Sequence, residues 1–302
     1  GYVLREDVLF SAKEELPELQ PFDEQAKQER INYILENGEE KTVQGRLEVL
    51  VYDDFENERS ETEYSIIENG VRNKIYSFEG HFLSGTEMRV SGIALGEEIV
   101  ALDFDIINEP IPFSEMGDEN PNLGEQRTAV FLVNSFENPI EPMTVEEVEE
   151  AFFSNNVNSV HPWIFNVSYE KAWLTGDVFG WYTLELTEEE ICGANINNQV
   201  VMEAIDPDVY FPNYTRLIFV IPPSSGCGFG GVASVGWPEE PFVSPEDGEF
   251  FATWISLNVV FSPNNFHVVA VHELGHNFGL YHANKWICSE GVIEGYCYSL
   301  AY

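Results

Sequence analysis

Five residues near the C-terminal end of the chain have the types and the spacing of a catalytic metal site. The stretch from His272 to His282 reads H-E-x-x-H-x-x-G-x-x-H. Residues four apart lie on one face of a helix, so His272 and His276 can offer two imidazoles to one metal ion. Gly279 permits a sharp turn at the end of that helix, after which His282 returns as a third nitrogen ligand. Glu273, beside the first ligand, is placed to activate a water at the metal.

Three neutral nitrogen ligands leave one tetrahedral position open, which is typical of a catalytic zinc site and not of a structural one. The short form H-E-x-x-H also occurs by chance on amphipathic helices, whereas the added glycine and third histidine make the longer form specific. An apolar run over residues 266–271 predicts a buried helix leading into the motif, with Ser262 and Pro263 as its N-cap and first turn. We therefore predict one Zn²⁺ ion on the three histidines and the glutamate as the catalytic base.

The composition limits the partners of the chain. With 302 residues and 44% hydrophobic residues, the sequence can build two packed domains or one large one. The formal net charge of −39 makes nucleic acid and anionic membranes poor partners. No apolar run is long enough to span a bilayer. A coat this acidic suits a saline setting, several Ca²⁺ sites or plain solubility, so Ca²⁺ is a second cofactor to consider. The oligomeric state stays open.

The four cysteines all lie in the second half of the sequence, and none forms a C-x-x-C pair. An even number of cysteines in an exported enzyme favours two disulfides. We expect Cys192 to pair with Cys227 and Cys288 with Cys297, the second link closing a short loop after the metal motif. The alternative is four buried thiols in a cytosolic protein. Because residues 1–6 show no secretory signal, the chain is expected to be either cytosolic or already trimmed, and the expected disulfides favour a secreted protein.

The first part of the chain divides into three segments. Residues 1–30 are charged and helix-prone, residues 31–107 are β-rich, and residues 108–126 are rich in Pro, Gly, Asn and acids and are expected to form a linker. Short β-like runs separated by Gly, Asn and Asp clusters predict five strands, at about 43–52, 61–67, 71–78, 86–94 and 97–107. Five strands within about 65 residues indicate a small barrel or sandwich.

Residues 127–302 alternate between strand and helix patterns. Thr144 and Thr187 each begin a capping box, with Glu147 and Glu190 three residues later. The predicted helices span about 144–153, 156–169 and 187–205, and the predicted strands span 127–134, 172–178, 181–186, 216–222 and 250–261. The fold class is therefore α+β.

The motif resembles that of the metzincin zinc metallopeptidases, and the flanking sequence is similar to the gametolysin-like branch of that family. The similarity covers roughly residues 127–302 and rests on the zinc motif, on Val167-Ser168-Tyr169-Glu170-Lys171, on Leu174-Thr175-Gly176-Asp177-Val178, on Trp181-Tyr182-Thr183 and on the run from Tyr214 to Pro222. It implies a twisted mixed sheet over two long helices, an active-site cleft along an edge strand, and hydrolysis of protein or peptide substrates. It also implies that the β-rich N-terminal half is similar to a propeptide.

Metzincins carry a methionine turn beneath the metal, downstream of the third histidine. The four methionines of this sequence all precede the motif, at positions 88, 116, 143 and 202, so the catalytic domain is expected to be C-terminally incomplete. No cysteine lies in the N-terminal half to occupy the metal. A plug from that half would therefore use an Asp, a Glu or His81; the alternatives are steric blocking, folding assistance or a permanent accessory domain.

These observations predict a secreted zinc-dependent endopeptidase, held latent as a proenzyme, in which Glu273 accepts a proton from water and passes it to the leaving amine. Two other functions stay open. One is a catalytically inactive binding module that keeps zinc for stability, and the other is a metal-dependent hydrolase acting on something other than peptides.

Overall fold

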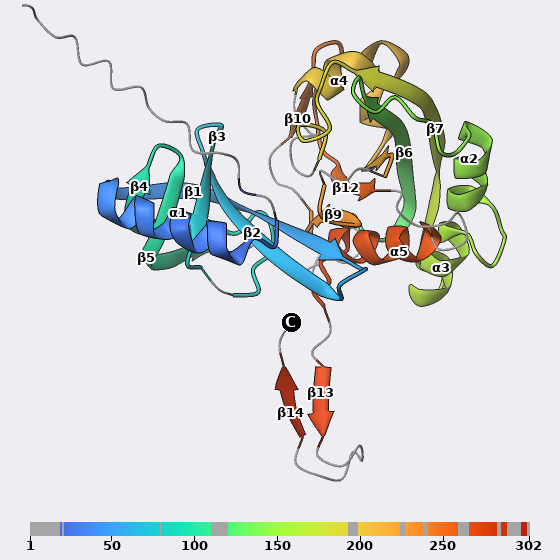
Figure 1. The fold of residues 1–302 in the computed structure, drawn as a ribbon. Helices are drawn as coiled ribbons and strands as arrows, with labels where there is room; N and C mark the ends of the chain where they lie inside the picture. Colours follow the sequence, from blue (N-terminus) through green and yellow to red (C-terminus); the bar gives the residue numbers. More distant parts are fainter. Residues whose placement is uncertain are drawn as a thin grey trace, which may run out of the picture.

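The structure is a computed structural model. It describes residues 19, 21–78, 80–109, 120–192, 199–223, 227–237, 241–258, 266–282, 285–288 and 297–300. The N-terminal half, defined here as the described residues 19–109, and the C-terminal half, defined as the described residues 120–282, lie side by side (Figure 1). The protein is α+β, with one large mixed sheet and few helices.

The N-terminal half is a small five-stranded barrel with one helix beside it. Its elements are α1 (Glu24–Asn37), β1 (Glu39–Asp54), β2 (Arg59–Glu68), β3 (Val71–Tyr76), β4 (Glu87–Leu95) and β5 (Glu98–Asn108). The strand pairings run β1–β2–β3–β5–β4 and return to β1, which closes the ring. Alternating side chains fill its interior, among them Val43, Ile66 and Val90, all fully buried.

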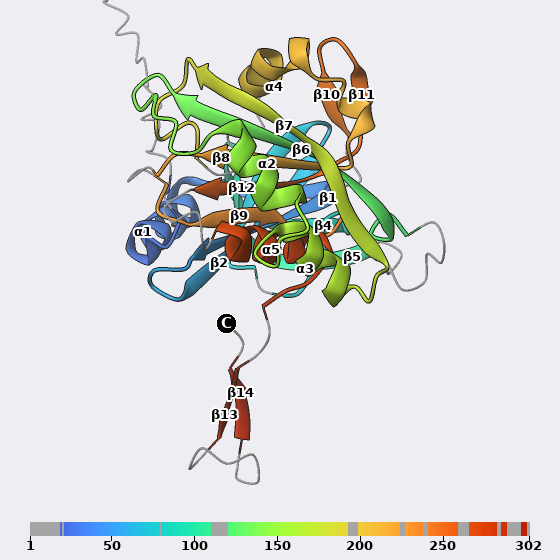
Figure 2. The same cartoon turned by 90° about the vertical axis from the view of Figure 1, so that its right-hand side faces the viewer.

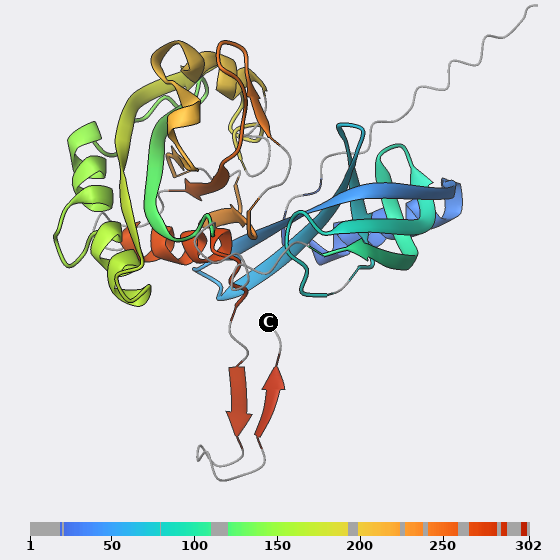
Figure 3. The ribbon, with the colours of Figure 1, turned by 180° about the vertical axis from the view of Figure 1, so that it is seen from behind.

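Strand β1 belongs to both halves of the protein. Its first half pairs with β4, and its second half pairs with β2 on one side. On the other side Leu50–Asp53 pair antiparallel with β9 (Gly231–Ser234) of the C-terminal half. Figures 1 and 3 show β1 and β2 reaching from the barrel towards the C-terminal half. The result is a continuous ten-stranded sheet with the order β2-β3-β5-β4-β1-β9-β12-β8-β6-β7.

The C-terminal half contributes five strands to this sheet. They are β6 (Gly124–Ser135), β7 (Ala172–Leu184), β8 (Arg216–Ile221), β9 and β12 (Thr253–Asn258). Neighbouring pairs among β7, β6, β8 and β12 are parallel, whereas β9 runs antiparallel to β12. The two strands predicted over 172–186 form the single strand β7. Its register against β6 shifts once. Two consecutive residues of β6 lie opposite Phe179 and Trp181, so Gly180 between them has no partner and forms a bulge.

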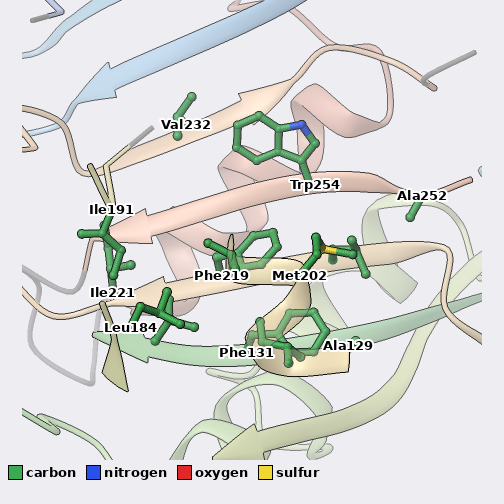
Figure 4. Close-up of a cluster of buried hydrophobic side chains, with 14 of the residues drawn as sticks. Ala129, Phe131, Leu184, Ile191, Met202, Phe219, Ile221, Val232, Ala252 and Trp254 are labelled. Atoms are coloured by element: carbon green, nitrogen blue, oxygen red, sulfur yellow. The ribbon is translucent and has the colours of Figure 1, made fainter. Parts of the chain in front are cut away.

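The two faces of this sheet carry separate cores. The helices α2 (Val145–Phe153), α3 (Val160–Val167) and α5 (Phe266–Asn277) cover one face (Figure 2). The other face carries α4 (Gln199–Ile205), the 3₁₀ turns Asp206–Asp208 and Phe211–Asn213, and the hairpin of β10 (Phe242–Ser244) and β11 (Gly248–Phe250). Phe131, Phe219 and Trp254 lie in the core on that side (Figure 4). The position of a side chain along each strand therefore decides whether it faces α5 or α4.

The helices are shorter than the resemblance implies. In the described part of the C-terminal half, the longest helix is α5, with 12 residues. The capping box at Thr144 forms and starts α2, but α2 ends before a stretch rich in Ser and Asn. Ser154 and Ser159 join their hydroxyls at 2.5 Å, and the amide of Asn156 donates to Ser154 Oγ. Such local side-chain bonds compete with helix formation, so the chain breaks before α3 begins.

The predicted helix over 187–205 is also wrong for much of its described length. The capping bonds between Thr187 and Glu190 are present, yet residues 188–191 form only a turn, and the described helical residues of this stretch are those of α4. A disulfide joins Cys192 to Cys227 with a Cα–Cα distance of 5.2 Å. This confirms the first predicted pair and ties the turn to the loop before β9.

The other predicted cysteine pair lies on the hairpin of β13 (Lys285–Cys288) and β14 (Cys297–Leu300). The backbone register sets Cys288 opposite Cys297, whereas their side chains lie outside the described residues. In the part of the chain that the structure describes, no helix combines the length and apolar character needed to cross a membrane.

Candidate metal centre

Helix α5 places two of the predicted ligands beside the junction of the two halves. His272 and His276 are one helical turn apart, with ring centroids separated by 5.1 Å. The helix is held against the sheet by Asn277, whose fully buried amide donates to Ser234 O at 2.8 Å and to Trp254 O at 3.0 Å. The metal motif is therefore fixed to β9 and β12. The predicted N-cap at Ser262 and Pro263 lies outside the described residues.

The end of α5 is a tight turn centred on Gly279. Its φ of 84° is in the left-handed region that favours glycine. The Gly279 amide donates to His276 O at 2.8 Å, and the Leu280 amide donates to Gly275 O at 3.0 Å. These two bonds form a Schellman motif. The turn also brings Leu280 O to 2.7 Å from His276 Nδ1, which fixes the ring so that Nε2 faces the site. The chain then returns with His282.

The fourth group at this site comes from the N-terminal half. Asp53, the next-to-last residue of β1, lies opposite Gly231 in the β1–β9 ladder. Side chains alternate along a strand, so Asp53 faces α5 while its neighbour Tyr52 enters the core on the other face. Phe55, two residues further along, packs edge-on against the His272 ring at 5.1 Å between centroids. The strand that joins the two halves therefore delivers a carboxylate to the histidines.

The four side chains converge on one point. One ligand atom from each of Asp53, His272, His276 and His282 lies within 4.8 Å of all the others. Asp53 Oδ2 is 3.2 Å from His272 Nε2 and 3.3 Å from His276 Nε2. Asp53 Oδ1 is 3.0 Å from His282 Nε2, and the Nε2 atoms of His272 and His282 are 3.0 Å apart.

These separations fit a shared metal ion. Tetrahedral zinc with bonds of about 2.0–2.1 Å needs neighbouring ligand atoms about 3.3 Å apart. Two imidazole nitrogens facing each other have no hydrogen bond to make unless one of them carries a proton. A divalent cation between them satisfies both rings and the carboxylate together. The group could therefore hold a metal ion, and its donor set of three nitrogens and one oxygen suits zinc.

Asp53 is held in its ionised form. Burial alone raises the pKa of a carboxyl group, but the contacts with the three histidine rings outweigh burial here and hold the pKa of Asp53 well below its usual range. The Asp53 side chain is only 7% exposed and the His276 side chain 3%, whereas the His272 side chain is 34% exposed. The His282 side chain is 20% exposed, so solvent reaches the site at His272 and, to a smaller extent, at His282.

Glu273 lies next to this cluster and is fully buried. Neither of its carboxylate oxygens has a hydrogen-bond partner among the described residues. Burial raises the pKa of Glu273 well above its usual range, and the charge of Asp53 raises it further. A Cβ at Gly231 would lie 2.1 Å from Glu273 Oε1. The carboxylate therefore packs directly on the backbone of β9, in space that only glycine leaves free.

The structure brings together the three histidines predicted to bind metal and sets Glu273 and the Gly279 turn beside them. It adds Asp53, which the sequence analysis did not single out among the many acidic residues of the N-terminal half. No local pattern marks this aspartate, because its position depends on the pairing of β1 with a strand about 180 residues away. His81 is not at the metal group; its ring instead stacks on Tyr281 at 4.9 Å between centroids.

No known protein-family model matches this chain, and no curated protein matches it significantly.

Proposed function

We propose that this chain is a zinc-dependent endopeptidase of metzincin-like arrangement that is latent in its intact form. The observation that carries the proposal is the convergence of three imidazole Nε2 atoms beside a fully buried, unpartnered glutamate. A carboxylate buried without a hydrogen-bond partner costs free energy and persists where it has a role. The predicted function gives Glu273 such a role as a general base.

When bound to the three histidines, zinc would supply Lewis acidity towards the scissile carbonyl group. Glu273 accepts a proton from the attacking water as the water oxygen bonds to the carbonyl carbon. The same carboxyl group then donates the proton to the leaving amine as the C–N bond breaks. Burial raises the pKa of Glu273, which favours the protonated form that donates to the leaving amine.

Latency follows from the position of Asp53 and β1. The Asp53 carboxylate converges with the three histidines, so it would act as a fourth protein ligand and compete with water and substrate for the zinc. The backbone of β1 also covers β9 over four residues. With β1 removed, β9 is the edge of the C-terminal sheet, and sheet edges bind extended peptides by strand addition. Asp53 is thus the residue we assign as the plug.

The disulfide between Cys192 and Cys227 supports a secreted location, since such links persist in oxidising compartments. Protein or peptide substrates are proposed on the same grounds as the activity. The low content of basic residues, 14 against 53 acidic ones, favours encounter with cationic peptides at low salt.

A second function is favoured by one specific feature. Four protein ligands close a zinc site, and closed sites are typically structural. The chain could then be an inactive binding module in which Asp53 completes a stabilising centre.

Glu273→Gln separates the two functions. Metal analysis of the purified chain, followed by a casein assay before and after limited proteolysis between the halves, should show zinc in both proteins and turnover only in the parent. Glutamine keeps the size of the side chain but cannot accept the proton. A chelator should abolish the parent activity. Equal activity in Glu273→Gln would refute the catalytic assignment, and zinc without activity in the parent would favour the binding module.

A further inference from the structure

Tyr281, the residue before the third histidine, is anchored in the N-terminal half. Its hydroxyl group donates to Phe82 O at 2.5 Å. Its ring stacks on His81 with 16° between the planes and packs against the core of the barrel. The barrel therefore binds the chain at Tyr281, one residue before His282.

Within the C-terminal half, the turn at the end of α5 holds the chain only as far as Leu280. The last backbone bond of the Schellman turn is made by the Leu280 amide. Beyond it, the described contacts of His282 are those with Asp53 and with the rings of His272 and His276. The direction in which His282 leaves the turn is therefore set by the contact between Tyr281 and the barrel.

The two halves also exchange core residues near this point. Leu50 and Tyr52 of β1 lie in the core of the C-terminal half, where Tyr52 packs edge-on against Phe229 at 5.6 Å. In return, Val235 lies fully buried in the barrel core, and its amide donates to Val49 O at 3.0 Å. Tyr281 is part of this reciprocal packing. The N-terminal half is a supporting element of the site as well as a cover.

We propose that the N-terminal half completes the metal site by positioning its third ligand, and that Tyr281 is the positioning residue through its bond to Phe82 O. The barrel then has two opposed effects on the same centre. Asp53 blocks the metal, while Tyr281 holds His282 where the metal needs it. Displacing the barrel removes both contacts, so release from latency also weakens metal retention. The inference rests on the proposed function only in that the three histidines bind zinc.

The test uses the full chain and measures the zinc dissociation constant by competition with a chromophoric chelator. Tyr281→Phe keeps the ring and its stacking but removes the donor. We expect its zinc dissociation constant to rise about fivefold, which corresponds to the loss of one ordinary hydrogen bond. Tyr281→Ala, which also loses the packing, should bind zinc more weakly still. Tyr210→Phe, at a tyrosine 58% exposed on the C-terminal half, is the matched control and should bind as the parent does.

A double-mutant cycle distinguishes positioning of the ligand from a general effect on the fold. In a His282→Ala background the third ligand is absent, so Tyr281→Phe should no longer change the zinc affinity. An unchanged zinc dissociation constant in Tyr281→Phe and Tyr281→Ala would overturn the inference. So would an equal loss of affinity with and without His282, because the tyrosine would then act through overall stability. Urea unfolding of the metal-free proteins identifies that outcome directly.

The readout does not depend on peptidase activity. If the parent binds zinc but cuts no peptide, the proposed function fails while the positioning of His282 is still decided by the affinities. If the parent cuts peptides but Tyr281→Phe leaves zinc affinity unchanged, the positioning inference alone fails.

Discussion

The substitution Gly231→Ala tests how Glu273, the proposed base, is held. Gly231 opposes Asp53 on one side and Leu257 on the other, and its backbone angles do not themselves require glycine. Space is the constraint. A Cβ at this position would lie 2.1 Å from Glu273 Oε1, 2.5 Å from its Cδ and 2.7 Å from its Cγ. Real Cβ atoms essentially never approach other atoms closer than 3.0 Å, so the oxygen must move by at least 3.0 − 2.1 = 0.9 Å.

The helix that carries Glu273 cannot easily take up this movement. Asn277 ties α5 to Ser234 and Trp254, and Leu274 packs in the core beneath it. Because the Cγ atom is also too close, rotation of the carboxylate alone does not remove the overlap. The side chain must change rotamer inside a full core, at a cost of about 1–3 kcal/mol. A catalytic group displaced by about 1 Å lowers the rate by about 100-fold.

Urea unfolding of the metal-free chain measures the first effect without reference to activity. Glu273→Ala removes the three atoms nearest to the new Cβ, so Gly231→Ala should cost about 1–3 kcal/mol in the parent and much less in the Glu273→Ala background. Gly180→Ala is the matched control, since its Cβ would meet only Val145 Cγ2 at 3.9 Å. An equal cost of Gly231→Ala in both backgrounds would refute the contact with Glu273. Zinc binding should change little, because none of the three histidines is touched.

Two further predictions concern the contacts between and within the halves. Asp53→Ala should let a small zinc-binding hydroxamate bind the zinc-loaded intact chain more tightly, because it empties the fourth ligand position while β1 still covers β9, whereas Asp103→Asn on the exposed part of β5 should not; equal affinities in the parent and Asp53→Ala would remove Asp53 as the plug. Replacing Cys192 and Cys227 together by serine should lower the unfolding free energy by about 4 kcal/mol, since the link spans 35 residues; a loss below about 1 kcal/mol in urea unfolding would contradict the chain-entropy account.

The local parts of the site could be predicted from the sequence because their geometry is local. The spacing of His272 and His276 follows from the helix period, and Gly279 marks the turn that returns His282. The five N-terminal strands were expected from alternation and occur with shifted ends, as in β1, which begins at Glu39 and continues to Asp54. The first disulfide pair was predicted correctly. These features each depend on short stretches of chain or on a simple pairing choice.

The place of Asp53 at the metal group could not be predicted, because it depends on the pairing of strands far apart in the sequence. Of the 53 acidic residues, the one at the metal group is selected by the register of β1 against β9. Shifting that register by one residue would turn Asp53 away from α5 and present Tyr52 or Asp54 instead. The sequence does not indicate the pairing of β1 with β9, because β1 has the residue pattern of an ordinary barrel strand. The helix predicted over 187–205 failed similarly, since its capping box was correct locally but the chain turns towards the disulfide at Cys192.

The continuous sheet also bears on the proposed release from latency. Freeing the metal group from Asp53 requires Leu50–Asp53 to leave β9, which withdraws Leu50 and Tyr52 from the core of the C-terminal half. Burial of each such side chain contributes about 1.5–3 kcal/mol, so the strand is held more firmly than the carboxylate alone would hold it. A cut between the halves breaks none of these contacts. It instead removes the tether that keeps the two surfaces at high effective concentration, so that β1, once detached, no longer returns.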